Sequence, residues 1–295
     1  MIKYKRTLGS TIFDTVNIII LLLLCLATVY PFLHMVAVSF SDKTQVLNNK
    51  VTFYPKGFVV DAYMLVFKDN TIWRAYINTI VYTLSDILIS VLGTAMFAYP
   101  LSKKYLWGRG PITFFITFTM FFSGGMIPSF LLVKSLHMYN TMWAIIIPGC
   151  IGVYNVIIMR TFFQNLPQSL DESARLDGAS EMNILFRIYL PLSLPVCATI
   201  ALWVGLGQWN NFMGPLIYFS DQKKYSLQIL LRQMIITGDQ VLNPALAEAF
   251  EEEYRTVPDS LKYATILVAT APVLVAYPFL QKYFVKGMLV GSIKG

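Results

Sequence analysis

The sequence predicts an all-α membrane protein, a single transmembrane domain over residues 1–295 with six membrane-spanning helices. Of its 295 residues, 56% are apolar and only 13% are charged, whereas soluble domains carry about 25% charged residues. The apolar residues lie in long uncharged runs, and runs of about 18 or more residues indicate membrane spans. The three cysteines lie far apart in such runs, without CxxC spacing. An ordinary soluble protein, a disordered chain and a disulfide scaffold are therefore excluded.

The six spans are expected at about residues 13–40, 76–101, 112–133, 142–163, 194–219 and 263–284. Each can cross the roughly 30 Å hydrocarbon core at 1.5 Å per residue. Nearly every span contains a proline: Pro31, Pro128, Pro148, Pro215, Pro272 and Pro278. Unpaired backbone groups are costly in lipid, so kinked helices are expected rather than loops. Close packing is expected at small residues, namely Gly93, Ala95, Ala98, Gly205 and Gly207.

Basic residues of the N-terminus and of the short second loop favour the cytoplasmic side. These residues are Lys3, Lys5, Arg6, Lys103, Lys104 and Arg109. The first loop opposes this with five basic residues, but it is longer, and long loops count less. We expect an uncleaved first helix and both termini in the cytoplasm, because the number of spans is even. The net charge of +7 is typical of anchoring at an anionic lipid surface and needs no nucleic acid.

Catalytic and metal-binding motifs are absent from the sequence. There is no GxxxxGK phosphate loop, no HExxH, no GxSxG and no Cys/His cluster. We therefore expect no catalytic residue, no metal and no cofactor in this chain. Asp86 is the one clear ionisable residue within a span, where such residues often serve transport. It either faces a pathway or a sister subunit, or is protonated or paired with Thr83 or Ser90.

The loop over about residues 164–192, cytoplasmic in this topology, carries local helix signals. Ser169 and Glu172 have the spacing of a capping box, so a helix is expected to begin near Leu170. Gly178 is placed to end that helix at positive φ, and Ser180 can cap a second helix. Apolar contacts are offered by Leu170, Leu176, Met182, Leu185 and Ile188. The two short helices either insert into a groove of another protein or lie on the membrane as an amphipathic linker.

This loop resembles the EAA loop of ABC importer permeases, whose pattern is EAA, three residues, Gly, nine residues and I-x-L-P. Here the pattern begins at Glu172, has its glycine at Gly178 and ends at Pro191; Ser173 replaces the first alanine. The resemblance implies a coupling helix seated in a cleft of an ATPase subunit. It places the coupling contact at Glu172, Ser173, Ala174, Asp177, Gly178 and Ala179. The family's C-terminal tail, here about residues 287–295, also reaches the ATPases.

Essentially the whole chain resembles the carbohydrate permeases of the maltose-permease type, with the type I ABC importer fold. Residues 119–136, 157–167 and 277–295 resemble the branch for complex oligosaccharides, including alginate and pectin fragments. The resemblance implies a bacterial plasma membrane location and a heterodimer with a second homologous permease. It further implies two ATPase subunits, which bind ATP and Mg, and an extracellular or periplasmic sugar-binding protein. This chain would not be an enzyme itself.

The fifth span carries an unusually polar and aromatic cluster. The candidate pathway residues are Trp203, Gln208, Trp209, Asn210 and Asn211. Gln208, Asn211 and Pro215 would share one helix face, where amides bind sugar hydroxyls and aromatic rings pack on sugar rings. The alternatives are interfacial tryptophan belts and amides that join helices. In the wider family this region lines the translocation path.

Two outer segments are candidate docking surfaces for the binding protein. The loop over about residues 220–262 holds an acidic run of Glu248, Glu251, Glu252 and Glu253, and maltose-type relatives have a scoop loop here. A solvated acidic helix face is the alternative. In the first loop, Tyr54, Pro55, Phe58 and Tyr63 form another such surface by resemblance.

Three functions are compatible with these features. The first is the permease subunit of an ATP-driven importer for an oligosaccharide, and the basic chain and the alginate and pectin likeness favour an acidic one. The second is an ion-coupled secondary sugar carrier that depends on Asp86. The third is a membrane scaffold without a pathway.

Overall fold

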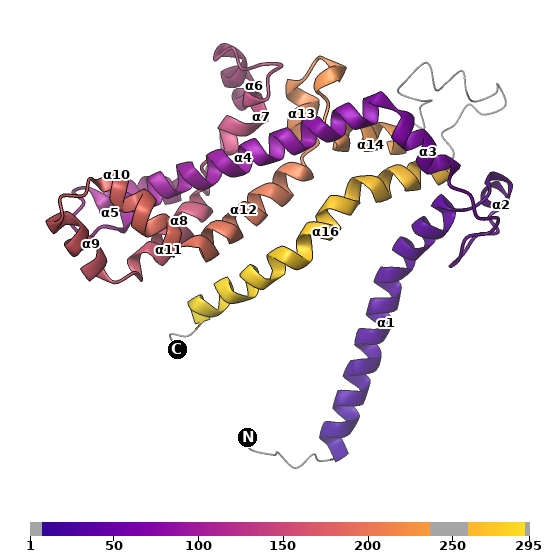
Figure 1. Cartoon of the computed structure of the whole chain (residues 1–295), viewed down its shortest axis with the longest axis horizontal. Coiled ribbons are helices and arrows are strands. Elements are labelled where there is room, and N and C mark those ends of the chain that lie inside the picture. Colours follow the sequence, from indigo (N-terminus) through magenta and orange to yellow (C-terminus); the bar gives the residue numbers. More distant parts are fainter. Residues whose placement is uncertain (1–7, 237–258, 293–295) are drawn as a thin grey trace. The chain divides into compact units, whose positions relative to one another are not determined.

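The computed structural model describes the backbone of residues 8–236 and 259–292, with side chains to residue 278. Its regular elements within these ranges are all helices (Figure 1), which confirms the predicted all-α class. The chain forms two compact units: residues 1–70 with 233–270, and residues 71–232 with 271–295. The single transmembrane domain expected from the sequence therefore stays a prediction.

The first unit begins with α1 (Leu8–Ser39), followed by α2 (Lys43–Leu47) and α3 (Asp61–Lys68). The most apolar part of α1 has no residue buried within the protein. A helix that is apolar all round is stable only against lipid or other helices. The end of α1 packs through Ala37 and Val38 on Val51 and on Tyr263, which lies in the first part of α16 (Asp259–Ser292).

The second unit begins with the long helix α4 (Asn70–Ser102). Shorter helices follow it: α5 (Arg109–Phe118), α6 (Met126–Ser135), α7 (Trp143–Ile146), η1 (Ile147–Gly149) and α8 (Val153–Gln164). Then come α9 (Gln168–Leu176), α10 (Glu181–Ile184), a π-helix (Leu185–Tyr189), α11 (Leu190–Leu192) and α12 (Leu194–Trp209). Next are α13 (Met213–Tyr218), η3 (Gln222–Lys224) and α14 (Leu227–Ile236), of which residues 227–232 belong to this unit. The described second part of α16, residues 271–292, also belongs to it. Figure 1 shows α9, α10 and α11 where α4 ends, α6 and α7 beside its middle, and α13 nearer its beginning.

Three described helices are long and apolar enough to cross a membrane: α1, α4 and residues 259–278 of α16. Two bent pairs raise this to five if each pair is one span. These are α7 and η1 with α8, bent by 51°, and residues 181–192 with α12, bent by 82°. The expected third span is not one helix, because α5 ends at Phe118 and α6 begins only at Met126. Gly125, at φ +87°, precedes α6, a conformation that glycine adopts without strain.

The core of the second unit joins α4, α8, α12 and the segment between them. Ala95 and Ala98 of α4 are fully buried there, with Met159 of α8 and Ile200 of α12. Gly205 allows close packing as predicted, because a Cβ there would lie 2.9 Å from Ile87 Cδ1 of α4. Gly207 was expected to do the same, but nothing lies within 4 Å of a Cβ at that position.

The chain after α13 is held by side chains that bind its backbone. Asn78 Nδ2 of α4 donates to the carbonyls of Lys223 and Tyr225, at 2.8 and 3.1 Å. Asn140, at φ +58°, accepts at Oδ1 from the amides of Ser220 and Asp221, at 3.3 and 3.4 Å. Donors and acceptors from two places in the fold therefore fix the course of this segment.

Candidate functional site

The loop with the EAA-type spacing folds as a hairpin of two short helices, α9 and α10, joined at Gly178. Gly178 has φ +76°, as predicted from the sequence. Its amide donates to the Arg175 carbonyl at 3.0 Å, and the Ala179 amide donates to the Ala174 carbonyl at 2.9 Å. These two bonds form a Schellman motif, which ends a helix where a residue adopts the left-handed conformation. We call residues 168–184 the coupling hairpin.

The start of α9 differs from the prediction. The helix begins at Gln168 with Pro167 as its N-cap and without a side-chain cap, so Ser169 lies inside the helix. The expected capping box of Ser169 and Glu172 is therefore wrong. Proline is well suited to a helix entry because its own φ is fixed and it has no amide hydrogen that would lack a partner there. The cap of the second helix is confirmed, because Ser180 Oγ accepts from the Asn183 amide at 3.4 Å.

The hairpin has a buried face and an exposed face. In α9 only Asp171 and Ala174 are buried. Ala174 therefore lies toward the core, and Leu185, expected to offer an outward contact, is also buried. Five of the predicted contact residues are exposed or half-buried: Glu172, Ser173, Asp177, Gly178 and Ala179. Leu176 is 89% exposed. The outer face thus presents a large apolar side chain beside charged ones.

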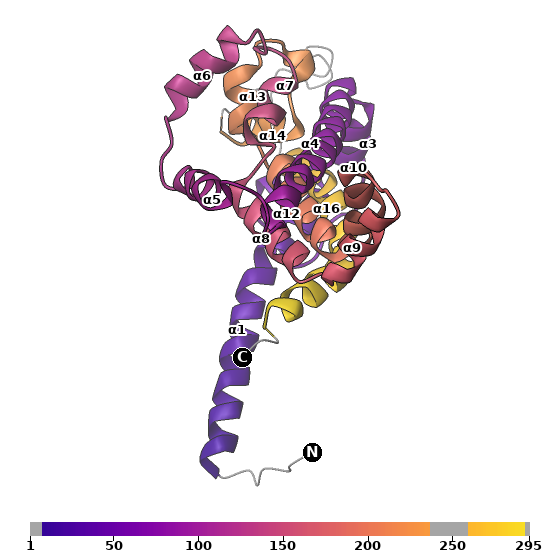
Figure 2. The ribbon, with the colours of Figure 1, turned by 90° about the vertical axis from the view of Figure 1, so that its left-hand side faces the viewer.

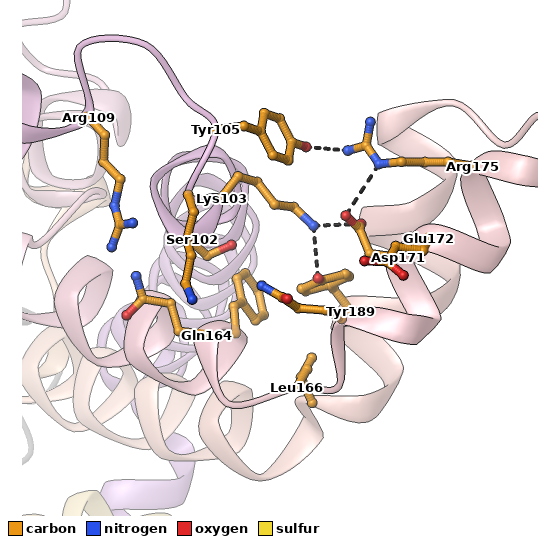
Figure 3. Close-up of a pocket in the computed structure, with 13 residues that line it drawn as sticks. Ser102, Lys103, Tyr105, Arg109, Gln164, Leu166, Asp171, Glu172, Arg175 and Tyr189 are labelled. Atoms are coloured by element: carbon orange, nitrogen blue, oxygen red, sulfur yellow. Dashed lines mark hydrogen bonds and ion pairs between the residues drawn. The ribbon is translucent and has the colours of Figure 1, made fainter.

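A buried lysine fixes the hairpin to the end of α4 (Figure 3). Lys103 Nζ donates to Asp171 Oδ1 of α9 at 2.6 Å and to the Tyr189 hydroxyl at 2.8 Å. It also lies 4.4 Å from the centre of the Tyr99 ring and 4.1 Å from that of the Tyr189 ring. Aromatic faces attract a cation most strongly when it is desolvated. Lys103 is therefore held both by an ion pair and by an aromatic cage.

A second cation extends this network across the hairpin. Arg175 Nε lies 3.3 Å from Asp171 Oδ2, and its Nη2 lies 2.5 Å from Glu181 Oε1. Arg175 also donates to the Tyr105 hydroxyl, while Tyr99 donates to Glu181 Oε2 at 2.7 Å. Burial raises the pKa of Tyr105, and Glu181 raises it further. The network joins α9, α10 and both sides of the α4 terminus.

A polar pocket of about 540 Å³ opens beside this network. Its lining includes Lys103 and Arg109 from the α4 end and α5, Gln164 from α8, and Asp171 and Glu172 from α9. Figure 3 shows Arg109 and Gln164 on the far side of the pocket from Arg175. Figure 2 shows α5 on one side, and α9 with α10 on the other side, of α4 and α12. The hairpin thus forms one wall of an opening lined by charged and amide side chains.

The sequence predicts for Lys103 only a role as a basic residue that keeps its loop on the cytoplasmic side. The spacing of Asp171 and Arg175 by four residues predicts an ion pair within the helix, and that pair is present. The partner 68 positions away has no such local signal. The lysine that follows the apolar run of α4 is the nearest hint, because such a residue must leave the bilayer.

Of the polar cluster in the fifth predicted span, the structure brings Gln208 and Asn211 into contact. The helix ends at Trp209, so Gln208, Asn211 and Pro215 do not share one continuous helix face, contrary to the prediction. Asn211 Nδ2 donates to Gln208 Oε1 at 3.1 Å, and its Oδ1 accepts from the Gly214 amide at 3.0 Å. These amides therefore satisfy each other and begin α13.

The other candidate pathway residues lie in different surroundings from one another. Asn210 is exposed, and its Nδ2 donates to the Leu206 carbonyl at 2.8 Å. Trp209 is buried against Tyr76, with ring centres 5.9 Å apart. It lines an apolar pocket of about 240 Å³. Trp203 instead packs on Tyr154 of α8 and does not line that pocket.

Asp86 is half-buried in α4 and accepts a hydrogen bond from Ser90 Oγ at 2.9 Å. Of the two hydroxyl partners considered from the sequence, Ser90 is therefore the one used. Ser90 is one helical turn away, so the bond is local to α4.

Several expected features lie outside the described residues or are exposed in the first unit. The acidic run from Glu248 to Glu253 is outside the description, as are the side chains of residues 287–295. In the first loop Tyr54 and Phe58 are exposed, and Phe40 stacks on both Phe58 and Tyr63.

The described residues form an all-helical protein with three helices that are long and apolar enough to cross a membrane, which defines the class of an integral membrane protein. Residues 89–290 match the family described as "Binding-protein-dependent transport system inner membrane component". The chain belongs to this family, which confirms the resemblance derived from the EAA-type loop and makes the protein an inner membrane component.

The relatives cover nearly the whole chain. It is 41% identical to the polygalacturonan/rhamnogalacturonan transport system permease protein YtcP of Bacillus subtilis (strain 168), over 97% of this chain and 99% of that protein. It is 42% identical to protein LplC of the same organism, over 98% and 97%. A solved bacterial ABC transporter involved in the import of the acidic polysaccharide alginate has a chain with TM-score 0.89 and 32% identity, over 96% of this chain and 100% of that one.

Proposed function

We propose that this protein is the permease subunit of an ATP-driven ABC importer that moves an acidic oligosaccharide into the cytoplasm. Its termini and the coupling hairpin lie in the cytoplasm. A second homologous permease completes the pathway, and two ATPase subunits bind and hydrolyse ATP with Mg. An extracellular or periplasmic binding protein delivers the sugar.

The observation that carries this proposal is the coupling hairpin. A short helix stopped by Gly178 presents Glu172 and the exposed Leu176, while its other face is fixed to α4. A large apolar side chain held on a rigid exposed helix is suited to a groove on a partner protein. A helix lying on the membrane would need a continuous apolar face, but α9 has only Leu170 and Leu176 as large apolar residues.

The hairpin would convert a partner's movement into a movement of this chain. Binding of ATP can shift the transporter between inward-open and outward-open states only through a difference in affinity for those states. That difference belongs to the ATPase subunits. This chain contributes a rigid connection from the hairpin to α4, and through the shared core to α8 and α12.

Support for an acidic oligosaccharide comes from the relatives. One is named for polygalacturonan and rhamnogalacturonan transport, and another belongs to a transporter for the acidic polysaccharide alginate. The net charge of +7 is compatible with such a substrate. Among the candidate pathway residues, Asn210 has an exposed side chain, and amides bind sugar hydroxyls.

The test is uptake by the reconstituted complex of both permeases, the ATPase subunits and the binding protein in liposomes. We expect uptake of uronic-acid oligosaccharides only with ATP and Mg, and weaker uptake of neutral ones. Uptake that persists without ATP, follows an ion gradient and is lost in Asp86→Asn would instead support the ion-coupled carrier. ATPase binding without flux of any sugar would support a scaffold.

A further inference from the structure

We propose that Lys103 is a positioning residue for transport: it fixes α9 to the end of α4, so that a push on the hairpin moves α4. This inference rests on the proposed function. The ammonium group of Lys103 joins two separate parts of the fold, with Tyr99 from α4 on one side and Asp171 with Tyr189 on the other.

Helix α9 has little other attachment to the core. Its only buried side chains are Asp171 and Ala174, and alanine contributes a small apolar area. The apolar anchors of the hairpin, Ile184 and Leu185, come from its second half and beyond. The buried attachment of α9 is therefore the bond between Asp171 and Lys103, beside the exposed bond from Arg175 to the Tyr105 hydroxyl.

The connection is stiff because its geometry is restricted on every side. The Lys103 side chain is 7% exposed, and the Asp171 side chain is 12% exposed. Short charge-assisted hydrogen bonds at 2.6 and 2.8 Å fix the position of the ammonium group between the two tyrosine rings. Tilting α9 away from α4 would take Asp171, with its helix partner Arg175, away from Lys103. The buried ammonium group would then lack a carboxylate, which is strongly unfavourable.

The neighbouring residue offers a matched control. Lys104 is also a lysine at the end of α4, but it is exposed. Its side chain is thus outside the aromatic cage formed by Tyr99 and Tyr189. A generally basic surface would need Lys104 as much as Lys103, whereas the proposed connection needs Lys103 alone.

The experiment uses the complete reconstituted importer and compares Lys103→Met, Asp171→Asn, the double variant, Lys103→Arg and Lys104→Met. Three quantities are measured: ATPase subunits retained on purification, ATP hydrolysis without sugar, and sugar taken up per ATP. We expect each single neutral variant to lower sugar per ATP by about tenfold or more, because each removes the ion pair that joins α9 to the end of α4. Lys104→Met should leave it unchanged.

The remaining variants separate coupling from stability. The double variant has no unpaired buried charge, so it should retain the ATPase subunits and hydrolyse ATP, yet still transport poorly. Lys103→Arg keeps the ion pair and should retain most coupling. The proposal is overturned if the double variant couples as well as the unchanged complex, or if Lys103→Arg is as impaired as Lys103→Met. If the single variants fail to insert into the membrane, the double variant and Lys103→Arg still test the proposal. Absence of ATP-driven uptake in the unchanged complex would contradict the proposed function instead.

Discussion

At the scale of single residues, Gly178 shows how a conformation can matter more than space. Nothing lies within 4 Å of the position a Cβ would occupy there, yet φ is +76°. A side chain at this position would therefore meet no neighbour, but the backbone would be strained. The helix end between α9 and α10, rather than packing, is what requires glycine.

Gly178→Val should destabilise the hairpin by about 1–2 kcal/mol, the cost of a left-handed residue with a Cβ. We expect sugar uptake and sugar-stimulated ATP hydrolysis to fall sharply while membrane insertion is retained. Gly178→Asn is the matched control, because asparagine tolerates this conformation. Normal stimulated hydrolysis in Gly178→Val would argue against a role of the turn in coupling.

Two adjacent asparagines should behave differently. Asn211→Ala leaves the buried Gln208 and the start of α13 without their partner and should lower thermal stability by about 1–3 kcal/mol. Asn210→Ala removes only an exposed bond to the end of α12. We expect it to alter sugar preference in uptake assays with little change in stability. Equal loss of stability in both variants would contradict this distinction.

At the residue scale, the sequence predicts features that depend on neighbouring residues, but not contacts between residues that are far apart in the chain. The helix stop at Gly178 and the cap at Ser180 follow from backbone rules that involve neighbours in sequence. The capping box at Ser169 failed because Pro167 starts the helix earlier. The bond between Lys103 and Asp171 depends on α4 and α9 meeting in space, which no spacing in the sequence encodes.

At the scale of helices, α12 packs closely on α4 at Gly205 and leaves open space at Gly207. The two positions differ by only two residues, so they lie on different sides of α12. The side toward Ile87 is closely packed, and the side at Gly207 is open. Composition alone could not separate them.

Gly205→Ala should therefore be less stable than Gly207→Ala by about 1 kcal/mol, because its Cβ must displace the Cδ1 methyl group of Ile87. Gly207→Ala should be neutral or slightly stabilising, because a Cβ there meets nothing. Alanine gains the same helix propensity over glycine at both positions, so the difference between the two variants isolates the packing cost. Thermal unfolding of the purified membrane protein measures both. Combining Gly205→Ala with Ile87→Val should reduce the difference, and equal melting temperatures of Gly205→Ala and Gly207→Ala would contradict the packing argument.

Hydropathy predicted where apolar helices lie, but it did not predict where they break. Hydropathy predicts one span over residues 112–133, yet this stretch divides into α5 and α6. The break contains Gly124 and Gly125, whose apolar neighbours outweigh them in a hydropathy average. The end of α12 at Trp209 was missed for the same reason, because the apolar character continues through α13.

At the scale of the whole molecule, function as a transporter subunit requires contact with proteins outside this chain. The hairpin offers one exposed and one buried position for probing that contact. Leu176 is 89% exposed, and Ala174 is 8% exposed. Both lie in α9, two residues apart, on opposite faces.

With Cys25, Cys150 and Cys197 replaced by serine, Leu176→Cys should crosslink to a cysteine placed in the ATPase groove. Ala174→Cys should not, because its side chain faces the core. The yield should also change with bound nucleotide if the hairpin transmits movement. Equal crosslinking at both positions, or no crosslinking of Leu176→Cys in a working transporter, would contradict a contact between the hairpin and the ATPase subunit.

Asn78 and Asn140 direct the chain after α13 through its peptide groups. Bonds to carbonyls and amides are indifferent to which side chains the held residues carry. The path of this segment can therefore stay constant while Gln222 and Lys223, which are exposed, are exchanged for other residues. The backbone path of this segment is thus fixed independently of its exposed side chains, so its surface can change in charge and shape without refolding.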